Sequence, residues 1–311
     1  MHRSWSTQDM PSLSGRLAVV TGANSGIGWI TARELARAGA EVVMAGRDAD
    51  RLREAADRLT AEVPRARLRP ELLDLADLAS VAVFAHRLGR EPGRPLDILV
   101  DNAGVMAIPE RRTTRDGFEL TVGVNHLGHF ALTGLLLPLL LRAPEPARVV
   151  TVSAAICRSP LAESDFDDLL SERRYQPMGA YAKSKLANVL FAVELQHRAD
   201  AAGVALTSVA VHPGTSLTGL QRHASHYTRA LEGLLLERLI GQPVEQAALT
   251  PLFAATDPAA APGGFYGPTG RFEARGAPGP VEFPRTAADL GRTRALWVLS
   301  ETLTGVRWAW P

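Results

Sequence analysis

The stretch "VVTGANSGIG", residues 19–28, joins the end of an apolar run to the beginning of a helical pattern. Gly22, Gly26 and Gly28 have no Cβ atoms, so the backbone here can turn tightly and approach a pyrophosphate closely. A helix that begins at this turn points its free N–H groups at such an anion. A glycine-rich turn without a ligand is the alternative. The strand–turn–helix context favours the first interpretation and predicts a dinucleotide-binding unit.

The same alternation of strand and helix continues along the chain. Apolar, β-branched runs are separated by helical patterns of about 10–20 residues, which implies right-handed βαβ crossovers and a parallel sheet. We therefore expect an α/β fold, a Rossmann-type doubly wound parallel sheet, in a single domain over residues 15–311 after an N-terminal tail, residues 1–14. Strands are predicted at 17–21, 41–45, 68–74, 96–100, 147–152 and 205–211, and helices at 26–38, 49–62, 77–89, 116–141, from about 180 to Gly203, and near 286–300. The Pro/Gly-rich residues from 256 to 284 predict a surface loop around a short strand.

Composition narrows the class of protein. Apolar residues make up 46% of the 311 positions, enough for a sizeable core, and the net charge of +1 gives no reason to expect nucleic acid or an anionic membrane as partner. Cys157 is the single cysteine, so no internal disulfide can form, which fits a reducing cytosol. The N-terminus lacks the apolar run of a signal peptide, and the apolar run at 130–141 is too short to span a bilayer. We expect a cytoplasmic protein.

The end of the second predicted strand indicates which dinucleotide binds. An acidic residue there would hold a ribose 2′-hydroxyl, whereas an arginine accommodates a 2′-phosphate. The sequence reads "VVMAGRD", so Gly46 stands at the expected acid position and Arg47 follows. This favours NADP(H). Asp48 leaves an alternative open, because it could serve the hydroxyl of NAD or could cap the next helix.

A tyrosine and a lysine lie one helical turn apart in "AYAKSKLAN", residues 180–188. Tyr181 and Lys185 would share one face of the helix. A phenol has a pKa near 10 and is a poor base at neutral pH. A positive charge ~4 Å away would favour the phenolate by up to roughly 4 kcal/mol at an effective dielectric of about 20. The pair therefore predicts general acid/base chemistry, the alternative being a surface tyrosine beside a solvated lysine.

In their order along the chain, the motifs resemble those of the short-chain dehydrogenases/reductases. They are "TGANSGIG", "DNAG" at 101–104, Asn125, "YAKSK" and "HPG" at 212–214, and the resemblance covers roughly residues 15–300. "TGANSGIG", "FDDL" at 166–169 and "AYAKSKLANVLFAVEL" are most similar to the retinol-dehydrogenase-like branch. The first residue of the usual "NNAG" motif is Asp101 here.

The resemblance implies an oxidoreductase that transfers a hydride between NADP(H) and a carbonyl or alcohol. It implies that Tyr181 is the proton donor/acceptor, that Lys185 binds the nicotinamide ribose and lowers the tyrosine pKa, and that Asn125 holds a water in the proton relay. The cofactor-binding residues that it implies are Gly22, Asn24, Ser25, Gly26, Ile27, Gly28, Arg47, Asp74, Leu75, Asn102, Ala103, Gly104, Tyr181, Lys185, Pro213, Gly214, Thr215 and Thr218. His126, His129 and His212 have no metal-ligand spacing, so we expect structural roles for them and no metal.

One departure from the family concerns the serine that normally ends the fifth strand and binds the substrate oxygen. The sequence reads "TVSAAI" at 151–156, so Ala154 matches the serine, and Ser153 should face the other side of the strand. Losing one such donor costs about 2.7–4 kcal/mol of transition-state stabilisation. Either the substrate is held otherwise, or Ser153 or Ser159 supplies the donor, or the protein binds NADP(H) with weak or no catalysis. An NAD-dependent alcohol dehydrogenase is a further alternative.

The small-molecule substrate is expected to be bulky and apolar. Residues 217–242 lie where the family closes over its substrate, and their leucine spacing predicts an amphipathic helix. A helix that packs on the core is the alternative. In this family the helices that carry Asn125 and Tyr181 commonly form a homo-oligomer interface, so an oligomer is possible here.

Overall fold

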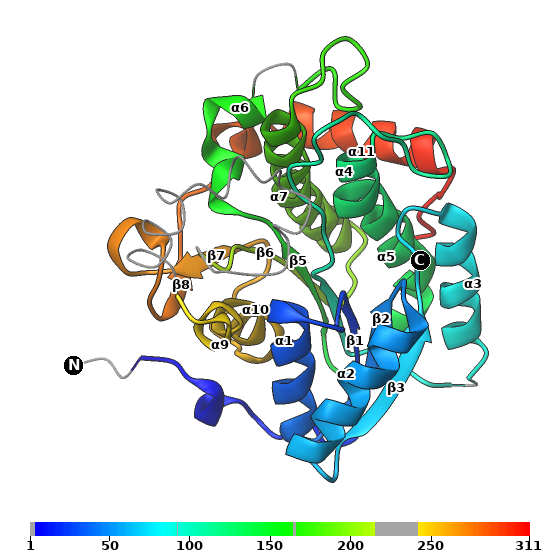
Figure 1. The fold of residues 1–311 in the computed structure, drawn as a ribbon, viewed down its shortest axis with the longest axis vertical. Helices are drawn as coiled ribbons and strands as arrows, with labels where there is room; N and C mark the ends of the chain where they lie inside the picture. Colours follow the sequence, from blue (N-terminus) through cyan, green and yellow to red (C-terminus); the bar gives the residue numbers. More distant parts are fainter. Residues whose placement is uncertain (1–3, 92, 164–165, 215–241) are drawn as a thin grey trace.

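A computed structural model describes residues 4–91, 93–163, 166–214 and 242–311 of the chain. In these residues eight strands form one sheet in the order β3-β2-β1-β4-β5-β6-β7-β8, and each neighbouring pair is parallel except β7 and β8 (Figure 1). The order reverses between β1 and β4, as it does in a doubly wound sheet, so the predicted fold class is confirmed. The strands are β1 (Leu17–Thr21), β2 (Glu41–Gly46), β3 (Arg67–Leu72), β4 (Ile98–Asp101), β5 (Ala147–Val152), β6 (Leu206–Val211), β7 (Phe265–Pro268) and β8 (Pro278–Pro280).

Helices cover both faces of the sheet because successive strand side chains point to opposite sides. In β1, for example, Ala18 and Val20 pack with one set of helices and Val19 with the other. The first set is α1 (Gly26–Arg37), α2 (Ala49–Glu62), α9 (Val244–Ala247) and α10 (Leu249–Thr256). The second set is α3 (Leu78–Gly89), α5 (Gly128–Leu140) and α7 (Pro177–Ala201), and α11 (Leu290–Thr304) packs on α7. Both faces are therefore buried, which explains the continuous apolar runs of the central strands.

The predicted helix at 116–141 differs from the observed one at its start and in its middle. The α-helix begins only at α4 (Leu120–Val122), because the Glu119 carboxylate caps it by accepting hydrogen bonds from the N–H groups of Thr121 and Val122. A π-helical turn, η2 (Gly123–Leu127), then separates α4 from α5. Such turns are rare and occur often at functional sites. The apolar spacing of this segment carries no signal for the change of period.

The Pro/Gly-rich region contains one more strand than expected. β7 is fully buried and parallel to β6, and β8 pairs with it antiparallel at the edge of the sheet. Prolines at both ends of β8 fit an edge position, where no further partner needs their missing N–H groups. The loop expected around a single short strand is therefore a short hairpin, which sequence-based strand signals miss because of its proline content.

The apolar helical stretch Leu120–Leu140 is the one stretch among the described residues that is long and apolar enough to cross a membrane, and 89% of it is buried inside the protein. Trp308, near the C-terminus, packs on it in an aromatic cluster and lies at ring-centroid distances of 5.4, 6.0 and 4.6 Å from Phe130, Phe191 and Trp297. It is packed as a core helix. The amphipathic helix predicted at 217–242 falls almost entirely outside the described residues.

Candidate active site

A cavity of about 760 Å³ lies at the carboxyl ends of the central strands, on both sides of the point where the strand order reverses. This is where open α/β sheets bind their ligands. Of the sequence-predicted site residues that the structure describes, every one except Asn125 lines this cavity; Thr215 and Thr218 lie outside the described residues. The lining residues that had been expected are Gly22, Asn24, Ser25, Gly26, Ile27, Gly28, Arg47, Asp74, Leu75, Asn102, Ala103, Gly104, Tyr181, Lys185, Pro213 and Gly214.

The glycine turn between β1 and α1 is held in a left-handed, closely packed conformation that favours glycine. Gly22 has φ +67°, and a Cβ atom on Gly28 would lie 2.5 Å from the carbonyl oxygen of Gly22. The turn is tied to the end of β4, because the side-chain amide of Asn102 donates to the Thr21 carbonyl at 2.8 Å. The N-cap residue Ser25 makes no side-chain capping bond, so the first N–H groups of α1 remain available toward the cavity. This end of the cavity fits a pyrophosphate.

Two arginines line the cavity where β2 ends. Arg47 is the residue expected there, and Arg51, in the first turn of α2, was missed because nothing in its spacing separates it from an ordinary helix arginine. Asp48 caps α2 by accepting a hydrogen bond from the Arg51 N–H at 3.1 Å, and its carboxylate lies 3.4 Å from the Arg51 side chain. The Asp48 carboxylate, which also lines the cavity, is thus engaged by its own helix, and Arg47 and Arg51 supply the cationic donors at this end.

Tyr181 and Lys185 lie together on the cavity face of α7. Their side chains are 8% and 3% exposed, so Tyr181 is not a surface tyrosine. The Lys185 Nζ donates to the Val152 carbonyl at 2.9 Å and lies 5.8 Å from the centroid of the Tyr181 ring. Burial raises the pKa of the Tyr181 phenol above its ordinary value and lowers that of Lys185 to about 8. In the protein chain alone, burial therefore sets the direction of the phenol pKa, and Lys185 does not bring it below its ordinary value.

Asn125 lies behind the cavity wall, in the π-helical turn. Its side-chain oxygen accepts from the Val105 N–H at 2.8 Å, and its amide donates to the Val105 carbonyl and to Ser184. The side chain therefore fixes the loop after β4. Its backbone carbonyl lies 3.0 Å from Nδ1 of the buried His129, whose pKa burial lowers to about 4. His129 is a neutral structural residue that links this turn to Thr21, 2.9 Å from its Nε2.

The end of β5 offers no hydroxyl at the expected position. Ala154 and Ser153 both line the cavity, so the expectation that Ser153 faces the other side of the strand is wrong, but the buried Ser153 hydroxyl donates to the Lys185 carbonyl at 2.6 Å. Ser159 does not line the cavity. The Ser153 hydroxyl is thus committed to the backbone of α7, where it helps to place the helix that carries Tyr181.

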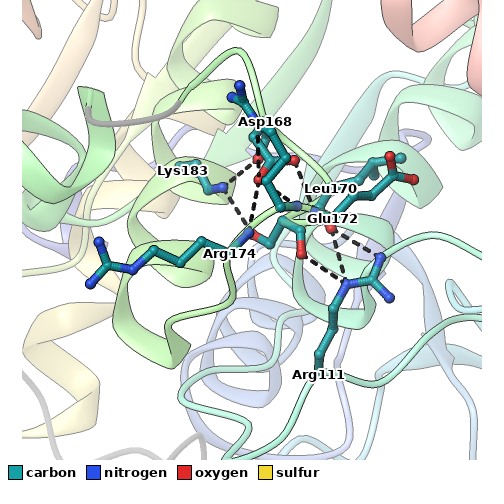
Figure 2. Close-up of polar contacts among 8 residues, drawn as sticks. Arg111, Asp168, Leu170, Glu172, Arg174 and Lys183 are labelled. Carbon is teal, nitrogen blue, oxygen red and sulfur yellow. Dashed lines mark hydrogen bonds and ion pairs between the residues drawn. The ribbon is translucent and has the colours of Figure 1, made fainter.

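A strap, residues 166–176, leads into α7 and is tied to two neighbouring segments (Figure 2). The buried Lys183 ammonium donates to the Asp168 carbonyl and the Ser171 hydroxyl, and Arg111 donates to the carbonyls of Leu170 and Ser171. The Tyr175 hydroxyl donates to the Ile108 carbonyl at 2.6 Å. These bonds hold the loop after β4 against the start of α7. Apolar side chains from both segments and from the end of β5 line this part of the cavity: Val105, Met106, Ala154, Ala155, Ile156 and Met178.

Comparison with known proteins identifies the family. Residues 16–165 match the family model described as short chain dehydrogenase. The chain is 39% identical to mouse retinol dehydrogenase 14, over 94% of this chain and 87% of that protein. It is 43% identical to mouse polyprenol dehydrogenase, over 95% of this chain and 86% of that one. The solved structure of the Pseudomonas aeruginosa RhlG/NADP active-site complex matches with a TM-score of 0.65 and 28% identity, over 82% of this chain and 94% of that chain. The chain therefore belongs to the short-chain dehydrogenase/reductase family of oxidoreductases, in its retinol-dehydrogenase-like branch.

Proposed function

We propose that the protein is an NADP(H)-dependent oxidoreductase that interconverts an apolar carbonyl compound and its alcohol. The observation that supports the proposal is that the two ends of one continuous cavity differ in chemistry. A glycine turn, a helix N-terminus and two arginines line one end, and Tyr181, Lys185 and an apolar wall line the other. A phosphorylated dinucleotide and an apolar substrate are the ligands that these two ends suit.

Different residues of the chain would bind the cofactor and transfer the proton. The glycine turn and the N-terminus of α1 hold the pyrophosphate, and Arg47 and Arg51 hold the 2′-phosphate. When bound, the nicotinamide supplies or accepts the hydride. In reduction, Tyr181 donates its phenolic proton to the carbonyl oxygen as the hydride reaches the carbonyl carbon, which gives the alcohol. Lys185, fixed on Val152, keeps a positive charge beside the phenol and can bind the nicotinamide ribose.

The apolar wall supports the substrate class. Met106, Ile156 and Met178 reach this end from three different segments, and Ala154 adds no polar group. The names of two relatives point the same way, because retinol and polyprenols are long apolar alcohols. Turnover of retinol, a short polyprenol and medium-chain aldehydes, each with NADP(H) and with NAD(H), tests both the substrate class and the reaction. No change in NADPH absorbance with any of them would argue against the proposal.

The preference for NADP(H) over NAD(H) is tested at the two arginines. Loss of one charge-assisted hydrogen bond costs about 1.5–3 kcal/mol, or roughly 10–100-fold in affinity. Arg47→Ala and Arg51→Ala should each weaken NADPH binding by such a factor and leave NADH binding nearly unchanged. Equal effects on both cofactors, or none, would favour the NAD-dependent alternative. The engagement of Asp48 by its own helix supports NADP(H).

A second candidate function is a cofactor-binding protein with weak or no catalysis. The observation that favours it is Ala154 at the position of the expected serine, with the Ser153 hydroxyl bonded to Lys185. Ala154→Ser distinguishes the two. If the missing donor limits the reaction, turnover should rise by about 10²–10³-fold. An unchanged and measurable turnover would mean that the substrate oxygen is held by other groups.

A further inference from the structure

The hairpin loop between β7 and β8 contains two consecutive strained residues. Phe272 and Glu273 have φ values of +57° and +52°, in the left-handed region that non-glycine residues seldom adopt. Each such residue costs about 1 kcal/mol or more, so the conformation persists only where other contacts determine it. Phe272 is 79% exposed and gains little from its position. Backbone hydrogen bonds from Thr269 and Gly270 to the Ala277 and Arg275 carbonyls close the loop, and the Glu273 side chain ties it to other segments of the protein.

The Glu273 carboxylate bridges two segments that are distant in sequence. Arg158, at the end of the short helix η3 (Ala155–Arg158), donates to both of its oxygens. The ring of His212, the residue after β6, lies 2.9 Å from Oε2 through its Nε2. The pKa of Glu273 is lowered below its ordinary value, mainly by its hydrogen bond with Arg158. The carboxylate is thus ionised and is the shared acceptor of both groups.

His212 connects the Glu273 carboxylate to the turn that follows β6. The Gly214 N–H donates to Nδ1 of the ring at 3.3 Å, so the proton of the neutral ring is on Nε2 and is donated to Glu273. The ring is buried between strand residues, since a Cβ atom on Gly267 would lie 2.2 Å from its Nε2. Gly214 has φ +72°, and a Cβ atom on it would lie 2.5 Å from the Ala274 carbonyl. The turn and the strained loop are therefore packed directly on each other.

The three segments that meet at Glu273 include two walls of the cavity. Ala155 and Ile156 of η3 line it on one side, and Pro213 and Gly214 line it where β6 ends. We propose that Glu273 is a positioning residue: through Arg158 and His212 it sets the spacing of these two walls and so orients the nicotinamide half of the cofactor beside Tyr181. This inference rests on the proposed function, because it requires a nicotinamide dinucleotide in this cavity. Nothing in the pattern of the sequence pairs Glu273 with either partner.

The adenine half of the cofactor gives an internal control. β6 lies four strand positions from β2, where Arg47 and Arg51 lie, which is roughly 19 Å at ~4.8 Å per strand. A change at Glu273 should therefore alter binding of the complete dinucleotide and leave binding of 2′,5′-ADP, which carries only the adenine half, within about twofold. A variant that merely unfolds part of the protein would weaken both ligands together.

The test compares dissociation constants of NADPH and 2′,5′-ADP, with thermal melting, for the wild type and three variants. Glu273→Gly removes the carboxylate and relieves the strain at this position, so it should fold. Glu273→Gln keeps acceptor and donor atoms at the same place. Glu34→Gln is the matched control, because Glu34 is a buried carboxylate that pairs with Arg33 and Arg37 and does not line the cavity.

We expect Glu273→Gly to weaken NADPH binding by about tenfold or more, with 2′,5′-ADP unchanged, and Glu273→Gln to recover part of the loss. Glu34→Gln should leave both ligands unchanged. Equal losses for the two ligands, or unchanged NADPH affinity in Glu273→Gly, would overturn the inference. A wild type that binds neither ligand would instead refute the proposed function, and the inference with it. A wild type that prefers NADH calls for NADH and 5′-AMP, and the same comparison then decides.

Discussion

Asp101 gives the sharpest prediction about stability, because its carboxyl is buried at the end of β4 with no cationic partner among the hydrogen bonds and ion pairs of the described residues. Burial raises its pKa from 3.8 to about 8. The Thr133 hydroxyl lies 3.0 Å from Oδ2 of Asp101 and 2.8 Å from the His129 carbonyl. One hydroxyl proton cannot serve both acceptors. A protonated Asp101 resolves the conflict, since it donates to Thr133 while Thr133 donates to His129.

The cost of this arrangement depends on pH. Well below pH 3.8, the carboxyl is protonated in both the folded and the unfolded chain and costs nothing. As pH rises toward 8, the unfolded chain releases the proton and the folded chain keeps it, so stability falls by about 1.4 kcal/mol per pH unit. The loss reaches at most roughly 4 kcal/mol at pH 7 and levels off above the folded pKa. Asp101→Asn puts an amide N–H donor beside Thr133 and does not titrate.

The assay is urea unfolding of the wild type and Asp101→Asn at pH 5, 6, 7 and 8. We expect the variant to be the more stable at pH 7, with an advantage that grows with pH until about 8. Asp97→Asn is the matched control, because Asp97 accepts hydrogen bonds from Arg16 at 2.7 Å and from the Leu17 N–H at 2.8 Å. That control should lose stability. A variant Asp101→Asn that is less stable than wild type at pH 7, or a difference that does not change with pH, would refute the reasoning.

Two further predictions concern the segments around the cavity. Lys183→Met removes the cation that holds the strap, so it should lower the free energy of unfolding by about 1–3 kcal/mol. It should also raise KM for an apolar substrate, while the dissociation constant of NADPH stays within about twofold. An unchanged KM would show that the strap does not shape the substrate end of the cavity. Trp308→Ala empties the centre of the aromatic cluster on α5 and α7, so it should cost about 3–5 kcal/mol in urea unfolding, and Trp308→Phe should recover much of it. A loss below about 1 kcal/mol for Trp308→Ala would mean that the C-terminal segment contributes little to the core.

Much of the fold could be predicted because local signals and burial agree. β1, α2 and β5 span the residues that the sequence predicts, since apolar β-branched runs end at glycines or at capping residues such as Asp48. The π-helical turn and β8 could not be predicted. The π-helical turn depends on close packing, in which a Cβ atom on Gly123 would lie 2.3 Å from Thr114. β8 forms because β7 is available as its partner, although its two prolines give the segment a low strand propensity.

The candidate site, like the fold, could be predicted from the sequence only in part. Motifs with fixed spacing identified the glycine turn, Tyr181 and Lys185, all of which line one cavity. Residues that act through distant contacts carry no such signal: Arg51 looks like any helix arginine, and Glu273 reaches Arg158 across more than a hundred residues. The electrostatics also differ from the simple expectation of a lysine that acidifies its neighbour. Burial of the phenol sets the direction of its pKa in the chain alone, and a sequence does not give the depth of a side chain.

The central claim is that the Tyr181 phenol is the proton donor for hydride transfer in this cavity. The most direct measurement is single-turnover oxidation of bound NADPH by an apolar aldehyde in the wild type and in Tyr181→Phe, with the dissociation constant of NADPH measured in parallel. The account predicts that the variant binds NADPH within a few-fold of the wild type and that its hydride-transfer rate falls by about 10²–10⁴-fold. Hydride transfer at the wild-type rate in Tyr181→Phe would contradict it.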